Sequence, residues 1–112
     1  MFKFVSSFLL GLILSLNACA EGVIEPEEAS VYVGKEKKVC GTVAQVVEKK
    51  GSLFVNFGGK YPNQVFHLYL TDKKKYKDLK GSVNKRVCAV GVISLYKNKP
   101  EITNPTYAGV EL

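Results

Sequence analysis

The alternation of apolar and polar positions predicts β-strands along most of the chain after residue 34. The clearest example is VFHLYL, which places three apolar side chains on one face, Phe66, Leu68 and Leu70. His67, the only histidine, and Tyr69 fall on the other face. A period of two is typical of a strand with one face on a hydrophobic core. We therefore expect His67 and Tyr69 to lie on the outer face of this strand.

Four other segments have the β-branched and aromatic composition of strands. KKVCGTVAQV and SLFVNF, joined by the turn EKKG, predict the first two, RVCAVGVISLY predicts a fourth, and EITNPTYAGVEL predicts a short fifth strand with a tail. In SLFVNF the uniformly apolar set is Leu53, Val55 and Phe57. We expect that set to face the core and Phe54 to point outward.

One segment between the third and fourth strands breaks the alternation. KKKYKDLKG is rich in helix formers and ends at Gly81, and Asp72 stands where a helix cap is expected. The resulting order, β-β-β-α-β-β, matches the five-stranded Greek-key barrel known as the OB-fold. A small open α+β sheet is the alternative architecture.

The first 20 residues are typical of an export signal. They carry Lys3, an apolar run and then small residues that end in Ala18-Cys19-Ala20. Cleavage after Ala20 is one interpretation; the other takes LNAC as a lipobox, with Cys19 as the lipidated first residue. We therefore expect a signal peptide in 1–20, a lead-in in 21–34 with one or two helical turns ended by Gly34, and an OB-fold domain in 35–112.

Export leaves Cys40 and Cys88 as a pair in an oxidising compartment, which favours a disulfide. Their bridge would close a loop of roughly fifty residues and contribute about 4 kcal/mol through loop-closure entropy. As metal ligands the two thiols would have only His67 to join them, and no C-x-x-C spacing occurs. We expect no metal and no cofactor.

The charge of the exported part is basic but moderate. Removing 1–20 takes away Lys3 and no acid, which leaves 15 basic and 10 acidic side chains and a net charge of +5. Arg86 is the only arginine. Lysines give diffuse attraction to polyanions rather than bidentate base recognition, and they also keep an exported domain soluble. The charge alone does not distinguish these roles.

Three segments of the chain share a family pattern, namely KKVCGTVAQV, SLFVNFGGKYPNQVFHLYL and LKGSVNKRVCAVGVISLYKNKPEI. Together they resemble a family of small bacterial OB-fold nucleic-acid-binding domains, and the likeness covers about residues 28–102. The Y-P-N-Q-V-F segment and the V-C-G and V-C-A-V-G strands are its most specific parts. The chain departs from the pattern at SVN before the fourth strand and at Ala89. The resemblance implies an OB-fold and a binding function.

Catalytic chemistry has little support in this composition. The acids of the expected barrel are few, and no two have the spacing that would join them on one strand face: Glu48, Asp72, Asp78 and Glu101. Nuclease chemistry on such a barrel needs arginines beside its acids, and Arg86 stands alone. NFGGK lacks the length and the following helix of a phosphate loop. We expect a non-catalytic protein.

OB-folds bind single strands or oligosaccharides across the outer face of their second and third strands. Here that face would present Phe54, His67 and Tyr69, and the flanking loops add Tyr96, Lys49, Lys50, Lys97 and Lys99. Stacking on such a platform favours single-stranded DNA or RNA with little sequence preference. The alternative is an envelope module, periplasmic or lipid-anchored, that binds protein, glycan or a small ligand. Contact with a membrane would come only through a lipid on Cys19.

Overall fold

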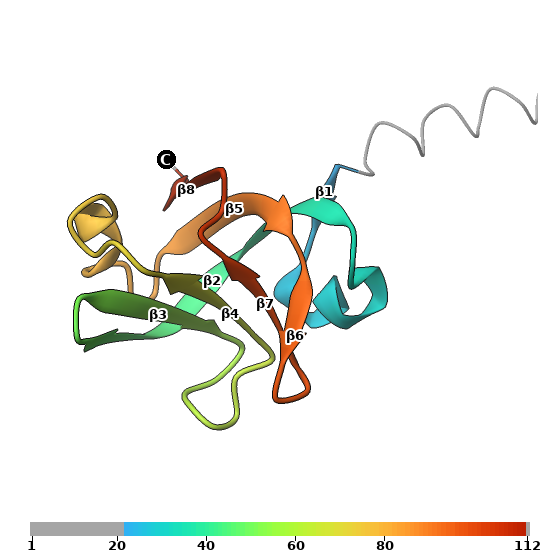
Figure 1. Cartoon of the computed structure of the whole chain (residues 1–112), viewed down its shortest axis with the longest axis horizontal. Coiled ribbons are helices and arrows are strands. Elements are labelled where there is room, and N and C mark those ends of the chain that lie inside the picture. Colours follow the sequence, from blue (N-terminus) through green and yellow to red (C-terminus); the bar gives the residue numbers. More distant parts are fainter. Residues whose placement is uncertain (1–21, 112) are drawn as a thin grey trace, which may run out of the picture.

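A computed structural model of the chain describes residues 22–111, so the predicted signal segment 1–20, with Cys19, lies outside the described residues. The described part is mostly β-structure (Figure 1). Its elements are β1 (Val23–Ile24), η1 (Pro26–Tyr32), β2 (Glu36–Lys49), β3 (Ser52–Phe57), β4 (Phe66–Leu70), η2 (Lys77–Leu79), β5 (Arg86–Val92), β6 (Ser94–Tyr96), β7 (Lys99–Thr103) and β8 (Tyr107–Val110). None of the helices in this part has the length and apolar character of a membrane span.

The strands form one curled sheet in the order β6-β7-β4-β3-β2-β5-β8, with β1 added beside β2. The long strand β2 takes part in two ladders. Its first half pairs antiparallel with β5, and its second half forms a hairpin with β3. Strands β4 and β7 pair in parallel. Through the ladder of β2 with β5, the first and fourth of the expected strands are thus neighbours in the sheet.

The strand count differs from the five that we predicted. The expected fourth strand is interrupted at Ile93, whose backbone bonds to Gly34 and Lys35 instead of continuing the ladder. The expected fifth strand is divided after Thr103, because β7 pairs with β4 whereas β8 pairs with the far edge of β5. The lead-in adds β1. The hydrogen-bonded path is therefore open between β6 and β8, and the predicted barrel is not closed by a continuous ladder.

The predicted helix over residues 73–81 is reduced to the single 3-10 turn η2. Five of those nine residues are lysines, and so short a helix gains little from cooperative hydrogen bonding. Its two apolar anchors, Tyr76 and Leu79, are buried three residues apart, as a 3-10 turn places them. Asp72 does accept from the backbone N–H groups of Lys74 and Lys75, but it closes a turn before η2.

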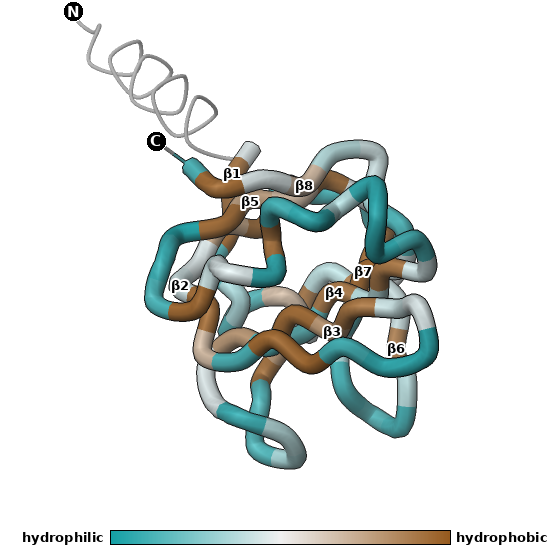
Figure 2. Tube along the Cα trace, turned by 90° about the vertical axis from the view of Figure 1, so that its left-hand side faces the viewer, coloured by the Kyte–Doolittle hydropathy of each residue, from teal (hydrophilic) through white to brown (hydrophobic). Residues whose placement is uncertain are grey.

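The core lies inside the curled sheet and follows the predicted alternation. Figure 2 shows the hydrophobic colour concentrated on the strands and the hydrophilic colour on the loops. The predicted inward set of β3 and that of β4 are each at most 1% exposed: Leu53, Val55, Phe57, Phe66, Leu68 and Leu70. The rings of Phe57 and Phe66 contact each other with centroids 5.5 Å apart. The alternate residues of β3 and β4 therefore point to the outer face of the sheet.

The lead-in packs onto the sheet through η1. Pro26 and Ala29 are its buried residues, and Pro26 lies directly over Gly41 of β2. A Cβ at Gly41 would lie 2.7 Å from Cδ of Pro26, closer than real Cβ atoms come. A glycine at this position of the V-C-G strand therefore allows η1 to reach the sheet.

The predicted disulfide is confirmed. Cys40 on β2 and Cys88 on β5 are directly opposite in the antiparallel ladder, with Cα atoms 4.0 Å apart and an S–S distance of 2.09 Å. Both residues are buried. The bridge joins the two halves of the sheet at the ladder that brings the N-terminal and C-terminal strands together.

One acidic side chain ties the segment around η2 to the β2–β3 hairpin. Glu48 forms ion pairs with Lys73 and, at 3.1 Å, with Lys80. The hydrogen bond from Lys73, helped by that from Lys80, holds the pKa of Glu48 below its usual value. The Glu48 carboxylate therefore binds a proton more readily in the unfolded chain than in the folded one. Its contribution to the stability of the fold is complete above the unfolded pKa and is lost as the pH falls through the lowered folded pKa.

We expect Glu48→Gln to make the acid-side decline of stability shallower, with a small loss of stability at neutral pH because the pairs are exposed. Chemical unfolding from neutral to acidic pH measures this. Glu36→Gln is the control, since Glu36 is exposed and forms no ion pair with any of residues 22–111. An unchanged pH profile in Glu48→Gln would contradict the assignment.

Candidate ligand-binding recess

Two rows of side chains cross the outer face of the sheet side by side. Residues opposite each other in neighbouring strands point to the same face. The registers of β2, β3, β4 and β7 therefore align a row with two aromatic residues, Val47, Phe54, Tyr69 and Thr103, next to a polar row, Gln45, Asn56, His67 and Glu101. The outer face thus contains a stacking surface beside a line of hydrogen-bonding groups.

An irregularity in β2 puts Gln45 on this face. Val43 pairs with Phe57 and Gln45 with Asn56, so the register shifts by one residue at Ala44. Such a bulge reverses which side chains of the strand point inward. Before it Val43 faces the core, and after it Val46 does so.

The aromatic row contains a stacked pair. The rings of Phe54 and Tyr69 have centroids 4.8 Å apart and planes inclined by 28°. Both side chains are half-buried, so part of each ring remains open to solvent. The His67 ring lies farther from Phe54, at 6.1 Å and tilted by 57°.

The polar row is joined by hydrogen bonds in two groups. Nδ2 of Asn56 donates to Oε1 of Gln45 at 2.8 Å, and the backbone N–H of Tyr61 donates to the same oxygen at 2.9 Å. At the other end Nε2 of His67 lies 2.8 Å from Oε1 of Glu101. The hydroxyl of Thr103 donates to the second oxygen of that carboxylate at 3.1 Å.

These rows form the floor of a recess of about 490 Å³. Its walls come from the β3–β4 loop and the β6–β7 turn, which both project from the lower side of the view in Figure 1. The lining residues are Gln45, Val47, Lys49, Phe54, Asn56, Tyr61, Pro62, Gln64, His67, Tyr96, Lys97 and Lys99. A volume of this size is within the range of small-molecule sites.

The recess brings together most of the residues that the sequence suggested. Six of them line it: Phe54, His67, Tyr96, Lys49, Lys97 and Lys99. Tyr69 does not line the recess itself, but it stacks on Phe54, which does. Lys50 also lies outside the lining, at the exposed turn after β2. Lys99 is half-buried, and its Nζ donates to the backbone carbonyl of Gln64 at 2.7 Å.

His67 differs from the expected stacking platform. It points to the outer face as predicted, but it is only 3% exposed, so it forms part of the floor rather than a surface for stacking. The cause is the parallel pairing of β4 with β7, which places Glu101 directly beside it.

Several lining residues were missed by sequence reasoning, namely Gln45, Asn56, Tyr61, Pro62 and Gln64. Pro62 and Gln64 belong to Y-P-N-Q-V-F, which supported the family resemblance but was not assigned to the site. The signal that was available is Asn56, a polar residue between the apolar residues Val55 and Phe57 of β3. Such a residue favours a polar partner on the neighbouring strands.

No protein-family model and no curated protein matches the sequence. Solved structures do match. The S. pombe Stn1-ten1 complex aligns with a TM-score of 0.52 and 12% identity over 68% of this chain and 57% of that one. A putative aspartyl-tRNA synthetase from Leishmania major Friedlin aligns with a TM-score of 0.62 and 10% identity over 81% of this chain but only 21% of its own.

A third similar structure is OBody AM1L10 bound to hen egg-white lysozyme, with a TM-score of 0.56 and 21% identity over 73% of this chain and 84% of that one. The chain has an OB-fold architecture. At these identities the likeness concerns the fold alone. The first two structures match over less than two thirds of their own length.

Proposed function

We propose that this protein is an exported, non-catalytic OB-fold module that binds single-stranded nucleic acid with little sequence preference. The observation that carries the proposal is the stacked pair of Phe54 and Tyr69 beside a recess bordered by lysines. Any of the bases can stack on an aromatic ring, and cations beside the rings can contact the phosphate backbone. Both parts of that arrangement are present on one face.

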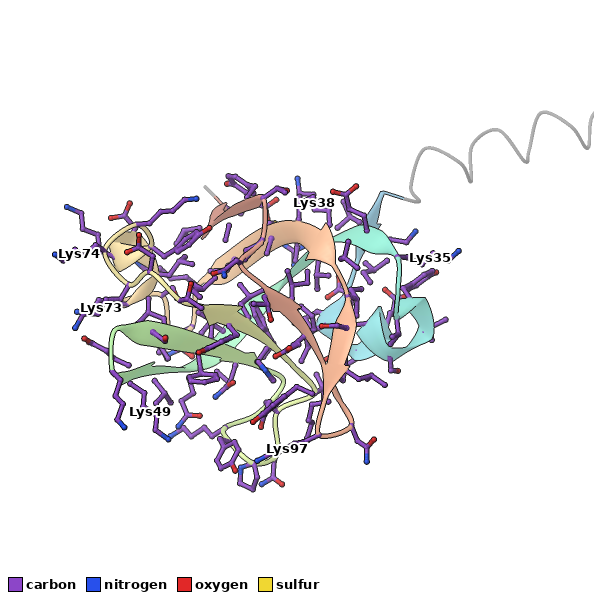
Figure 3. All side chains as sticks on the ribbon, viewed as in Figure 1. Lys35, Lys38, Lys49, Lys73, Lys74 and Lys97 are labelled. Atoms are coloured by element: carbon purple, nitrogen blue, oxygen red, sulfur yellow. A yellow bond between two sulfur atoms is a disulfide. The ribbon has the colours of Figure 1, made fainter. Side chains whose placement is uncertain are left out.

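The charge around the recess supports an anionic ligand. Within residues 22–111 its lining contains three lysines and no carboxylate. Lys49 and Lys97 both lie along the lower side of Figure 3, whereas Lys35, Lys38 and Lys74 project from other sides of the molecule. A polyanion lying across the recess would meet cations from both flanking turns.

The structural neighbours are compatible with this proposal and with its alternative. Two of them are the putative aspartyl-tRNA synthetase named above and the asparaginyl-tRNA synthetase from Pyrococcus horikoshii. The OBodies are bound to lysozyme, a protein. The alternative function is an envelope module for protein, glycan or a small ligand. The disulfide is compatible with an oxidising, exported setting for either function.

The test is a titration of the mature domain with fluorescent oligonucleotides at low and high salt. We expect Phe54→Ala to weaken binding by about tenfold, because stacking contributes about 1–3 kcal/mol per base. Tyr107→Ala is the matched control, since Tyr107 is an exposed aromatic on β8, outside the recess.

Equal affinity of Phe54→Ala and the parent protein, with binding that still falls as salt rises, would mean generic attraction by lysines. A complete lack of binding at low salt would refute the proposal. The envelope alternative would then take first place.

A further inference from the structure

Two residues that line the recess each have a buried polar atom without a hydrogen-bond partner among the described residues. Oε1 of Gln64 and Nδ1 of His67 have no hydrogen bond to any part of residues 22–111. Gln64 and His67 are both among the residues that line the recess, and they are 5% and 3% exposed. Buried polar groups in folded proteins are nearly always hydrogen-bonded, so an unpartnered pair at a recess points to a ligand.

Both atoms are hydrogen-bond acceptors. Glu101 accepts from Thr103 through one oxygen and has the His67 Nε2 at 2.8 Å from the other, so a proton on Nε2 satisfies the carboxylate. In the neutral imidazole this leaves Nδ1 as an acceptor. The amide oxygen of Gln64 is an acceptor in any state. These two acceptors therefore favour a ligand group that donates hydrogen bonds.

We propose that the recess selects a nucleobase that carries an exocyclic amino group over thymine or uracil. The amino groups of cytosine and adenine each carry two N–H donors, whereas thymine presents a carbonyl oxygen at the equivalent edge. A carbonyl facing either acceptor leaves both groups unpaired, and sites built for hydrogen bonding reject such analogues. The inference rests on the proposed function and adds one selective base position to an otherwise sequence-tolerant face.

Cytosine and thymine are the best matched probes, because both are pyrimidines and differ mainly at this edge. Oligodeoxycytidylate and oligothymidylate of about eight nucleotides fall within the length that one OB-fold covers. We expect the cytidylate to bind about tenfold more tightly, the ratio that one satisfied buried group typically supplies. The experiment uses the mature protein at neutral pH and low salt.

Gln64→Met removes one acceptor at similar size and leaves the backbone carbonyl that accepts from Lys99. We expect it to reduce the ratio to about threefold or less, mainly by weakening the cytidylate, with thymidylate affinity nearly unchanged. A structural loss would instead weaken both oligonucleotides equally. Tyr107→Ala should keep the parent ratio.

A spectroscopic readout reports on the site directly. His67 is the only histidine, so its ring nitrogens give a single set of signals in a ¹⁵N-labelled sample. We expect the Nδ1 resonance to shift on addition of the cytidylate and to stay in place with the thymidylate.

The outcomes separate this inference from the proposed function. Equal affinity for the two oligonucleotides, with a steep salt dependence, would overturn the selective position and leave the binding function standing. A preference for cytidylate that survives Gln64→Met, without a shift at Nδ1, would also overturn it. If neither oligonucleotide binds, both proposals fall.

Discussion

Replacing Cys40 and Cys88 together by alanine is expected to lower the free energy of unfolding by about 4 kcal/mol. The bridge spans 48 residues of sequence, so its loss returns a large loop entropy to the unfolded chain. For a domain of this size such a loss lowers the melting temperature by on the order of 20 °C. Alanine suits the test because both positions are buried and a serine hydroxyl there would need a partner.

Chemical unfolding of the mature protein, with and without a reductant, measures this effect. The reductant should lower the stability of the parent protein to about that of the double variant and leave the variant itself unchanged. Intact mass under non-reducing conditions provides the control on the bridge. Two free thiols in the purified protein, or a parent protein insensitive to the reductant, would contradict the prediction.

The loss should act on stability and not on ligand binding. The bridge lies in the β2–β5 ladder, whereas the recess lies across β2, β3, β4 and β7 beyond the bulge at Ala44. Well below its lowered melting temperature, the double variant should therefore bind oligonucleotides like the parent protein. This separation distinguishes what holds the fold from what forms the site.

The strands that have strict alternation were predictable from sequence. In β3 and β4 each inward residue is apolar and the period of two is unbroken, so local pattern alone identifies the core face. The pairing of β2 with β5 was also predictable, because a disulfide between Cys40 and Cys88 needs the two cysteines on neighbouring segments.

The parts that depend on long-range pairing could not be predicted. A bulge at Ala44 leaves no local mark in VAQVV, so Gln45 gave no sign of facing the recess. The burial of His67 results from its place beside Glu101 on a strand 34 residues later. Interruptions at Ile93 and after Thr103 arise from competing backbone partners, and composition does not reveal them.

Neutralising Lys49, Lys97 and Lys99 together with glutamine should weaken binding to a single strand by about a hundredfold at 0.1 M salt. The logarithm of the affinity falls as the logarithm of the salt concentration rises, and each cation that contacts a phosphate adds about 0.7 to the steepness of this fall. Losing three such cations should therefore make the fall shallower by about 2. The three line one recess, and Lys99 is held there by its bond to the Gln64 carbonyl. Fluorescence anisotropy over a salt series measures both quantities.

The matched control neutralises Lys35, Lys74 and Lys77, which carry the same total charge and are exposed, but lie outside the recess. Both triple variants have the same net charge, so a difference between them reflects the position of the cations and not their number. Diffuse attraction to a basic protein would weaken both variants alike and give equal slopes, and that result would refute a localised phosphate path. A selective loss in the recess variant, combined with the effect of Phe54→Ala, would mean that rings and cations on this face act on the same strand.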